Sequence, residues 1–121
     1  MSIGEVAREL DLSIDTLRYY EKIGLVKNIN KINGKREYTD ENIKDLKFIL
    51  CMKSAGLSLM DIKKFLKYYE EGNETLDLRI DMLKNQKIVL EKEIKEKQDT
   101  LDYLNYKIDL YKKRKGDKEW N

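Results

Sequence analysis

Positively charged side chains gather in one short stretch of the chain. Residues 22–36 contain no aspartate or glutamate but carry five cations, Lys22, Lys27, Lys31, Lys35 and Arg36. A stripe of lysine and arginine can neutralise phosphates, which gives affinity for nucleic acid that does not depend on base sequence. A run of lysines alone more often does no more than keep a surface solvated. The elements that position these charges therefore decide which interpretation holds.

Other kinds of chemistry have few side chains to work with. The 121 residues include no histidine and one cysteine, Cys51, which is too few ligands for a soft-metal site within one chain. The same shortage removes Ser-His-Asp and Cys-His catalysis, and no Gly-rich phosphate loop is found. The net charge of +2 neither indicates nor excludes a nucleic-acid partner. We expect no enzymatic activity, no metal and no cofactor.

The length allows one compact domain plus an appendage. No apolar run approaches the length of a membrane span, and the N-terminus has no signal-peptide pattern. The sequence therefore predicts a soluble, cytoplasmic protein without a membrane partner.

Two short amphipathic helices open the chain. Ser2 and Glu5 have the spacing of a capping box, and Ser13 is placed to cap a second helix that ends near Gly24. A turn of three or four residues at Asp11-Leu12 would join them into a helix-turn-helix. The second helix exposes Ser13, Thr16, Arg18 and Tyr19, which could meet base edges or phosphates in a major groove.

A small hairpin is predicted directly after these helices. Asn33-Gly34 is a strong signal for a type I′ turn, whose two central positions need positive φ. Two further helices follow, one over residues 40–54 capped by Thr39 or Asp40, and one opened by Ser58. A hairpin in this position is a wing, so we interpret residues 1–71 as a winged helix-turn-helix module.

A long helix follows from about residue 75. Eleven positions from 76 to 111 follow alternating steps of four and three, and all but Lys87 and Lys97 are apolar. This is a heptad seam, formed by Leu76, Ile80, Leu83, Leu90, Ile94, Leu101, Leu104 and Ile108. A helix of roughly 39 residues would be about 58 Å long, too long to bury this seam on the N-terminal module. A second copy of the helix is the expected partner, giving a homodimer through residues 75–113, with 114–121 as a charged tail. The predicted fold class is all-α with a small β-hairpin wing.

Several strings together resemble one family. They are Ile3–Ala7, Ser13–Leu25 with its T-L-R-Y-Y-x-x-x-G-L pattern, Arg36–Tyr38 and Gly56–Ile62. Over residues 2–70 the chain is similar to the MerR family of bacterial regulators. The resemblance implies a dimer with antiparallel dimerisation helices that distorts promoter DNA and so affects RNA polymerase indirectly.

The resemblance also implies roles for individual residues. Arg18 and Tyr19 would lie along base edges and backbone, and Tyr20 and Lys22 would approach phosphates or pack beneath them. Lys35, Arg36 and Tyr38 would belong to the wing contact, and Lys53 matches a phosphate contact of the family. For Tyr20 and Tyr38 a packed ring with an exposed hydroxyl is an equal alternative.

Cys51 raises the question of the inducer. Residues 48–58 resemble the branch of the family associated with aldehydes and nitrosative stress, whose lone third-helix cysteine is the proposed electrophile sensor. Lys47, one turn before Cys51, and the nearby Lys44 and Lys53 would favour its thiolate. The alternative is a small buried core thiol.

Two other functions stay open. One keeps DNA binding but gives the effector role to a small molecule in a dimer pocket lined by Phe65, Tyr68, Tyr69 and their neighbours. The other is a coiled-coil module whose basic face binds a protein; it predicts binding indifferent to salt, whereas DNA binding predicts a steep dependence on salt.

Overall fold

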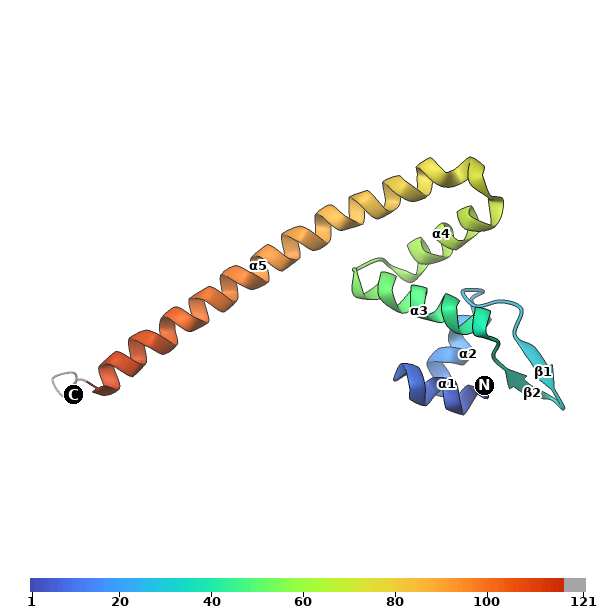
Figure 1. Ribbon diagram of the computed structural model, residues 1–121, viewed down its shortest axis with the longest axis horizontal. Coiled ribbons are helices and arrows are strands. Elements are labelled where there is room, and N and C mark those ends of the chain that lie inside the picture. The colour runs from blue at the N-terminus through green and yellow to red at the C-terminus, as the bar shows by residue number, and fades with distance from the viewer. Residues whose placement is uncertain (117–121) are drawn as a thin grey trace. The chain divides into compact units, whose positions relative to one another are not determined.

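The computed structural model describes residues 1–116 as a chain of helices interrupted by one hairpin (Figure 1). Its elements are α1 (Ile3–Leu10), α2 (Ile14–Lys22), β1 (Asn30–Ile32), β2 (Lys35–Glu37), α3 (Asp40–Ser54), α4 (Leu59–Glu71), a 3-10 turn η1 (Asn73–Thr75) and α5 (Leu76–Gly116). The predicted fold class is confirmed. The chain divides into two compact units, Met1–Lys84 and Asn85–Asn121.

The predicted capping residues begin α1 and α2. The amide of Glu5 donates to the Ser2 hydroxyl at 3.2 Å, and the amide of Ser2 donates to the Glu5 carboxylate at 3.3 Å. The Ser13 hydroxyl accepts from the Thr16 amide at 3.0 Å. Asp11, with φ of 53°, reverses the chain between the two helices. These local bonds satisfy backbone groups that a short helix otherwise leaves without partners.

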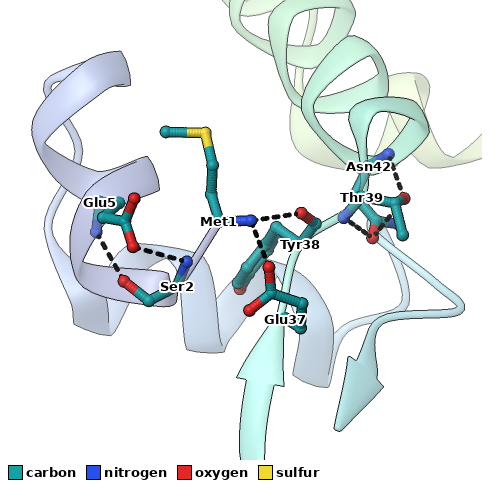
Figure 2. A network of polar contacts seen from close by, with 7 residues as sticks. All are labelled: Met1, Ser2, Glu5, Glu37, Tyr38, Thr39 and Asn42. Carbon is teal, nitrogen blue, oxygen red and sulfur yellow. Dashed lines mark hydrogen bonds and ion pairs between the residues drawn. The ribbon is translucent and has the colours of Figure 1, made fainter. Parts of the chain in front are cut away.

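The hairpin forms at the predicted turn. Asn33 and Gly34 have φ of 53° and 77°, as a type I′ turn requires, and Lys31 lies opposite Arg36 in the antiparallel register. The hairpin is also tied to the start of the chain (Figure 2). The Met1 amino group donates to the Glu37 carboxylate at 2.6 Å and to the Tyr38 carbonyl at 2.9 Å. These bonds hold a wing that would be too small to persist alone.

A second capping box begins α3 (Figure 2). Of the two caps that the sequence left open, Thr39 is the one formed, and it exchanges hydrogen bonds with Asn42. The Asn42 side chain is 3% exposed and donates to the Lys27 carbonyl at 3.1 Å. One asparagine thus caps α3 and fixes the loop that leads from α2 into the wing.

The core of the first unit draws on α1, α2, α3 and α4. Val6 from α1, Leu17 and Tyr20 from α2, Leu46 and Ile49 from α3, and Ile62 from α4 are almost fully buried. Their burial removes apolar surface from water, which is the main force holding these short helices together. The backbone of the DNA-binding candidate residues is therefore set by packing.

In contrast to α1, α2, α3 and α4, the long helix α5 buries none of its residues in this chain. Most of the predicted seam is exposed, from 40% at Leu83 to 59% at Ile94, and Leu90 is half-buried. The helix runs to Gly116, three residues beyond its predicted end at residue 113. Its last turn carries Lys113, Arg114 and Lys115, whose charges favour a helix C-terminus. The rest of the predicted tail, with Trp120, lies outside the described residues.

Within residues 1–116 no helix is both long enough and apolar enough to span a bilayer.

Candidate nucleic-acid interface

The exposed face of α2 presents a ring and two cations. Tyr19 is 50% exposed, and Arg18 and Lys22 are exposed as well. The Arg18 guanidinium lies 4.0 Å from the Asp15 carboxylate, but both side chains are largely in solvent. An exposed pair of this kind contributes little and is easily given up to a phosphate. This face agrees with the predicted contact surface.

The two predicted hydroxyl contacts already have partners in the chain. The oxygens of Ser13 and Thr16 lie 2.7 Å apart, and the Ser13 oxygen also caps α2. Ser13 is exposed and Thr16 is half-buried. Their first role is to begin the helix, and a contact to DNA would use the remaining lone pairs of the same oxygens.

The wing cations differ from one another. Lys35 is exposed, and its ammonium makes no hydrogen bond or ion pair within the described residues. The Arg36 guanidinium instead donates to the Glu21 carboxylate, and each side chain is 28% exposed. This pair ties the second strand of the wing to the end of α2. Arg36 therefore positions the wing, and its charge is partly compensated before any DNA binds.

For Tyr38 the alternative to a wing contact is a packed ring with an exposed hydroxyl; the ring is packed, but the exposed hydroxyl is wrong for the chain alone. Tyr38 is 2% exposed, and its hydroxyl is buried without a hydrogen-bond partner within the described residues. Burial raises the pKa of this phenol, and the nearby Glu21 carboxylate raises it further. Tyr38 lies between β2 and α3, and its amide and carbonyl are hydrogen-bonded to Met1. With the backbone held there, the ring packs into the core.

Tyr20 is likewise a core residue, and it positions a cation. The residue is 1% exposed, so the ring is packed, but the hydroxyl is not exposed as the packed alternative assumed. Its hydroxyl accepts from the Lys53 ammonium at 3.0 Å, and the same ammonium lies 5.6 Å from the ring centroid. This contact brings Lys53, from the end of α3, to α2. Nothing in the sequence spacing of 33 residues indicated that juxtaposition.

The basic stripe is not free of acids once the chain is folded. Lys27 lies 3.2 Å from the Glu70 carboxylate of α4, and Arg36 is paired with Glu21. Two of the five cations are thus paired within the chain. Lys22, Lys31 and Lys35 stay exposed and make no ion pair within residues 1–116.

Sequence reasoning missed Asn42 and the contacts of Glu37. Both lie outside the cation pattern, yet they fix the loop and the wing that carry it. The spacing of Thr39 and Asn42 was a usable signal, since an amide at the third helical position can close a capping box as Glu or Gln does.

Cys51 is exposed on α3, so the buried-thiol alternative is wrong for the chain alone. Exposure gives the thiol the access that a reactive cysteine needs. No group of three or more acidic, cysteine or histidine side chains within the described residues could hold a metal ion.

Comparison with known proteins agrees with this geometry. A model of the MerR HTH family of regulatory proteins matches residues 1–69, and a model of MerR DNA-binding regions matches residues 43–106. An uncharacterised HTH-type transcriptional regulator of Haemophilus influenzae is 35% identical over 113 residues, which are 93% of this chain and 84% of that protein. The HTH-type transcriptional regulator AdhR of Bacillus subtilis is 38% identical over 88 residues, 72% of this chain and 63% of that one.

A solved structure extends the likeness to three dimensions. HiNmlR, a MerR family regulator lacking the sensor domain and crystallised on promoter DNA, superposes with a TM-score of 0.89 and 33% identity, over 96% of this chain and 89% of that one. These relatives are transcriptional regulators and not enzymes, as the sequence predicted for this chain. This chain belongs to the MerR family of helix-turn-helix transcriptional regulators.

Proposed function

We propose that this chain binds promoter DNA as a homodimer and regulates transcription by distorting that DNA. The observation that carries the proposal is the likeness to HiNmlR, which was crystallised on promoter DNA and matches almost the whole of this chain. The exposed cations and ring of α2 and the wing supply a surface of the right chemistry. In this proposal Arg18, Tyr19 and Lys22 enter a major groove, and Lys35 and Lys53 contact phosphates.

The homodimer is inferred from the apolar seam of α5. Seven of its residues are at least 40% exposed in one chain. Leaving this much aliphatic surface in water along a helix of 41 residues is unfavourable. A second copy of the same helix covers the seam by heptad packing and sets two recognition helices on one duplex.

Distortion of the duplex is the step that would reach RNA polymerase. A dimer that holds two half-sites can bend or untwist the DNA between them, and the deformation energy depends on the sequence deformed. A change in the dimer would then alter how the promoter is presented to polymerase. In this proposal, regulation needs no direct contact between the protein and RNA polymerase.

Selection of bound sequences from random duplexes tests DNA binding, and sedimentation of the free protein tests the dimer. We expect a preferred palindromic site, a dimer at micromolar concentration and affinity that falls steeply with salt. A protein that is monomeric and ignores every duplex at low ionic strength would refute the proposal. Binding unaffected by salt would instead support the coiled-coil interaction module, which the family match disfavours.

We further propose that Cys51 switches this regulator by reacting with an electrophile. The thiol is exposed on α3, and the side chains of Lys47 and Lys44 on the same helix are exposed too. Addition of an aldehyde or nitroso group there changes the size and polarity of one α3 side chain. That change can move the DNA-binding module relative to the dimerisation helix.

Mass spectrometry after exposure to formaldehyde, methylglyoxal or an S-nitrosothiol tests this switch. We expect one adduct per chain, located on Cys51, and loss of induction in Cys51→Ser. The matched control is Met52→Leu on the neighbouring position, which should be induced normally. An unmodified Cys51 in the folded protein, or a normal response of Cys51→Ser, would end the hypothesis.

A non-covalent effector is the second candidate, and one observation favours it. Phe65 and Tyr69, two of the three aromatic residues predicted to line an effector pocket, lie at a cavity of the first unit. Thermal stabilisation of Cys51→Ser by a metabolite would support this alternative, because that variant cannot respond through its thiol.

A further inference from the structure

A cavity of about 360 Å³ lies in the first unit, and none of its lining residues is a candidate DNA-binding residue. Its lining comes from α3, α4 and the beginning of α5, and consists of Glu41, Lys44, Asp45, Phe48, Phe65, Leu66, Tyr69 and Arg79. The volume is at the lower end of the range of small-molecule sites, which is about 300–1,000 Å³. It fits a ligand of one or two rings.

The apolar part of the cavity is aromatic. The rings of Phe48 and Phe65 have centroids 5.2 Å apart and planes tilted by 32°. Both residues are half-buried, and Tyr69 is 64% exposed beside them. Rings in this arrangement offer faces with negative electrostatic potential, which attract organic cations as well as other rings.

The acidic part of the cavity has no ion-pair partner within the described residues, and Lys44 is the cation that lines the cavity beside it. Asp45 is half-buried. Neither its carboxylate nor that of Glu41, one turn earlier, makes a hydrogen bond or ion pair within residues 1–116. Burial raises the pKa of Asp45, and the Glu41 carboxylate raises it further, while Lys44 offsets part of this. A carboxylate that has lost water without gaining a partner is costly to the fold. A bound cation would relieve that cost.

The one guanidinium at the cavity is already occupied. Arg79 donates to the Gly72 carbonyl at 2.9 Å and to the Thr75 hydroxyl at 3.1 Å, and lies 5.5 Å over the Tyr69 ring. These contacts hold Arg79 against the turn between α4 and α5. Its charge is therefore poorly placed to recognise an anion. The other cation of the lining, Lys44, is exposed and offsets only part of the rise in the pKa of Asp45 that burial and the Glu41 carboxylate cause.

We propose that this cavity binds an aromatic organic cation, with the ring of the ligand against Phe48 and Phe65 and its cationic nitrogen beside Asp45. Three helices line the site, so a bound ligand links α3 and α4 to the beginning of α5. Binding itself depends only on the cavity, whereas an effect on transcription rests on the proposed regulatory function.

The experiment compares three probes of nearly equal shape and different charge. They are naphthylmethyl-trimethylammonium, its neutral isostere neopentylnaphthalene and the anion naphthylacetate. Amide NMR spectra of the full chain are recorded during each titration. We expect the cation to shift amides of α3, α4 and the beginning of α5, and to bind about tenfold more tightly than the neutral probe because of its charge.

Two variants of equal charge change locate the site. Asp45→Asn should weaken binding of the cation about tenfold and leave the neutral probe unaffected. Glu9→Gln, which removes one negative charge on α1 outside the cavity, should leave both unaffected. Equal binding of the neutral and cationic probes, unchanged affinity in Asp45→Asn, or shifts confined to other elements would overturn the proposal.

Two further readouts separate the possible failures. Sedimentation of Asp45→Asn without ligand reports whether a second copy of the chain occupies the cavity; a weakened dimer would show this and overturn the ligand proposal. Duplex binding by the same samples reports on the proposed function. If no ligand binds but the duplex does, only the ligand proposal is refuted. If the ligand binds but no duplex does, only the proposed regulatory function is refuted.

Discussion

Lys27 and Lys35 belong to the same basic stripe but should contribute unequally to DNA binding. Lys35 is exposed at the start of β2 and makes no ion pair within the described residues, whereas the Lys27 ammonium lies 3.2 Å from the Glu70 carboxylate. We compare Lys35→Gln with Lys27→Gln. Each removes one positive charge from the same surface, so the two variants are matched controls for one another.

The expected magnitude follows from the number of phosphates that the protein neutralises, because each neutralised phosphate releases condensed counterions from the DNA. One lysine–phosphate contact contributes about 0.9 to the magnitude of the slope of log affinity against log salt concentration. A dimer has two copies of Lys35, so in Lys35→Gln the magnitude of the slope should fall by about 1.8. Between about 50 and 200 mM salt, that change corresponds to about twelvefold in affinity. For Lys27→Gln the loss should be well below this, since drawing Lys27 to a phosphate leaves the Glu70 carboxylate unpaired beside the DNA.

Fluorescence anisotropy of a labelled duplex over a series of KCl concentrations measures both slopes, and circular dichroism confirms that the variants are folded. Equal slopes for the two variants would refute the reasoning, because they would show that the pairing with Glu70 does not matter on DNA. A slope in Lys35→Gln identical to that of the unmodified protein would place the wing away from phosphates.

Three further outcomes are expected. Leu101→Asp puts a charge on the exposed seam of α5 and should give a monomer that no longer binds duplexes, whereas Glu96→Gln off the seam should sediment as the unmodified protein does. Tyr38→Phe removes a buried hydroxyl without a partner and should keep or raise the free energy of unfolding, by up to about 1 kcal/mol. Since the raised pKa of Tyr38 means that only the unfolded phenol ionises near pH 10, the unmodified protein should lose stability above that pH and Tyr38→Phe should lose less. Asn42→Ala removes the side-chain half of the α3 capping box and the bond to the Lys27 carbonyl, and should lower the free energy of unfolding in urea by about 1–3 kcal/mol; a loss below a few tenths would contradict its anchoring role.

Local patterns were sufficient to predict the elements of this protein. Ser2, Ser13 and Ser58 cap helices where the sequence placed them, and Asn33-Gly34 forms the predicted turn. The reason is that caps and tight turns depend on hydrogen bonds and φ preferences within three or four residues. The heptad pattern of α5 was visible for the same reason, since it is a repeat along one helix.

Contacts between distant residues decided what the functional side chains do. The sequence alone determined that Lys27, Arg36 and Lys53 are cations near or within a helix-turn-helix module. Only the tertiary structure paired them with Glu70, Glu21 and Tyr20, which are 15 to 43 residues away in the chain. It also buried Tyr38 and exposed Cys51, two outcomes that periodicity left undecided. Composition and spacing fix the type of a side chain and its place on an element, but the packing of elements fixes its neighbours, and those neighbours determine whether a charge is available to DNA.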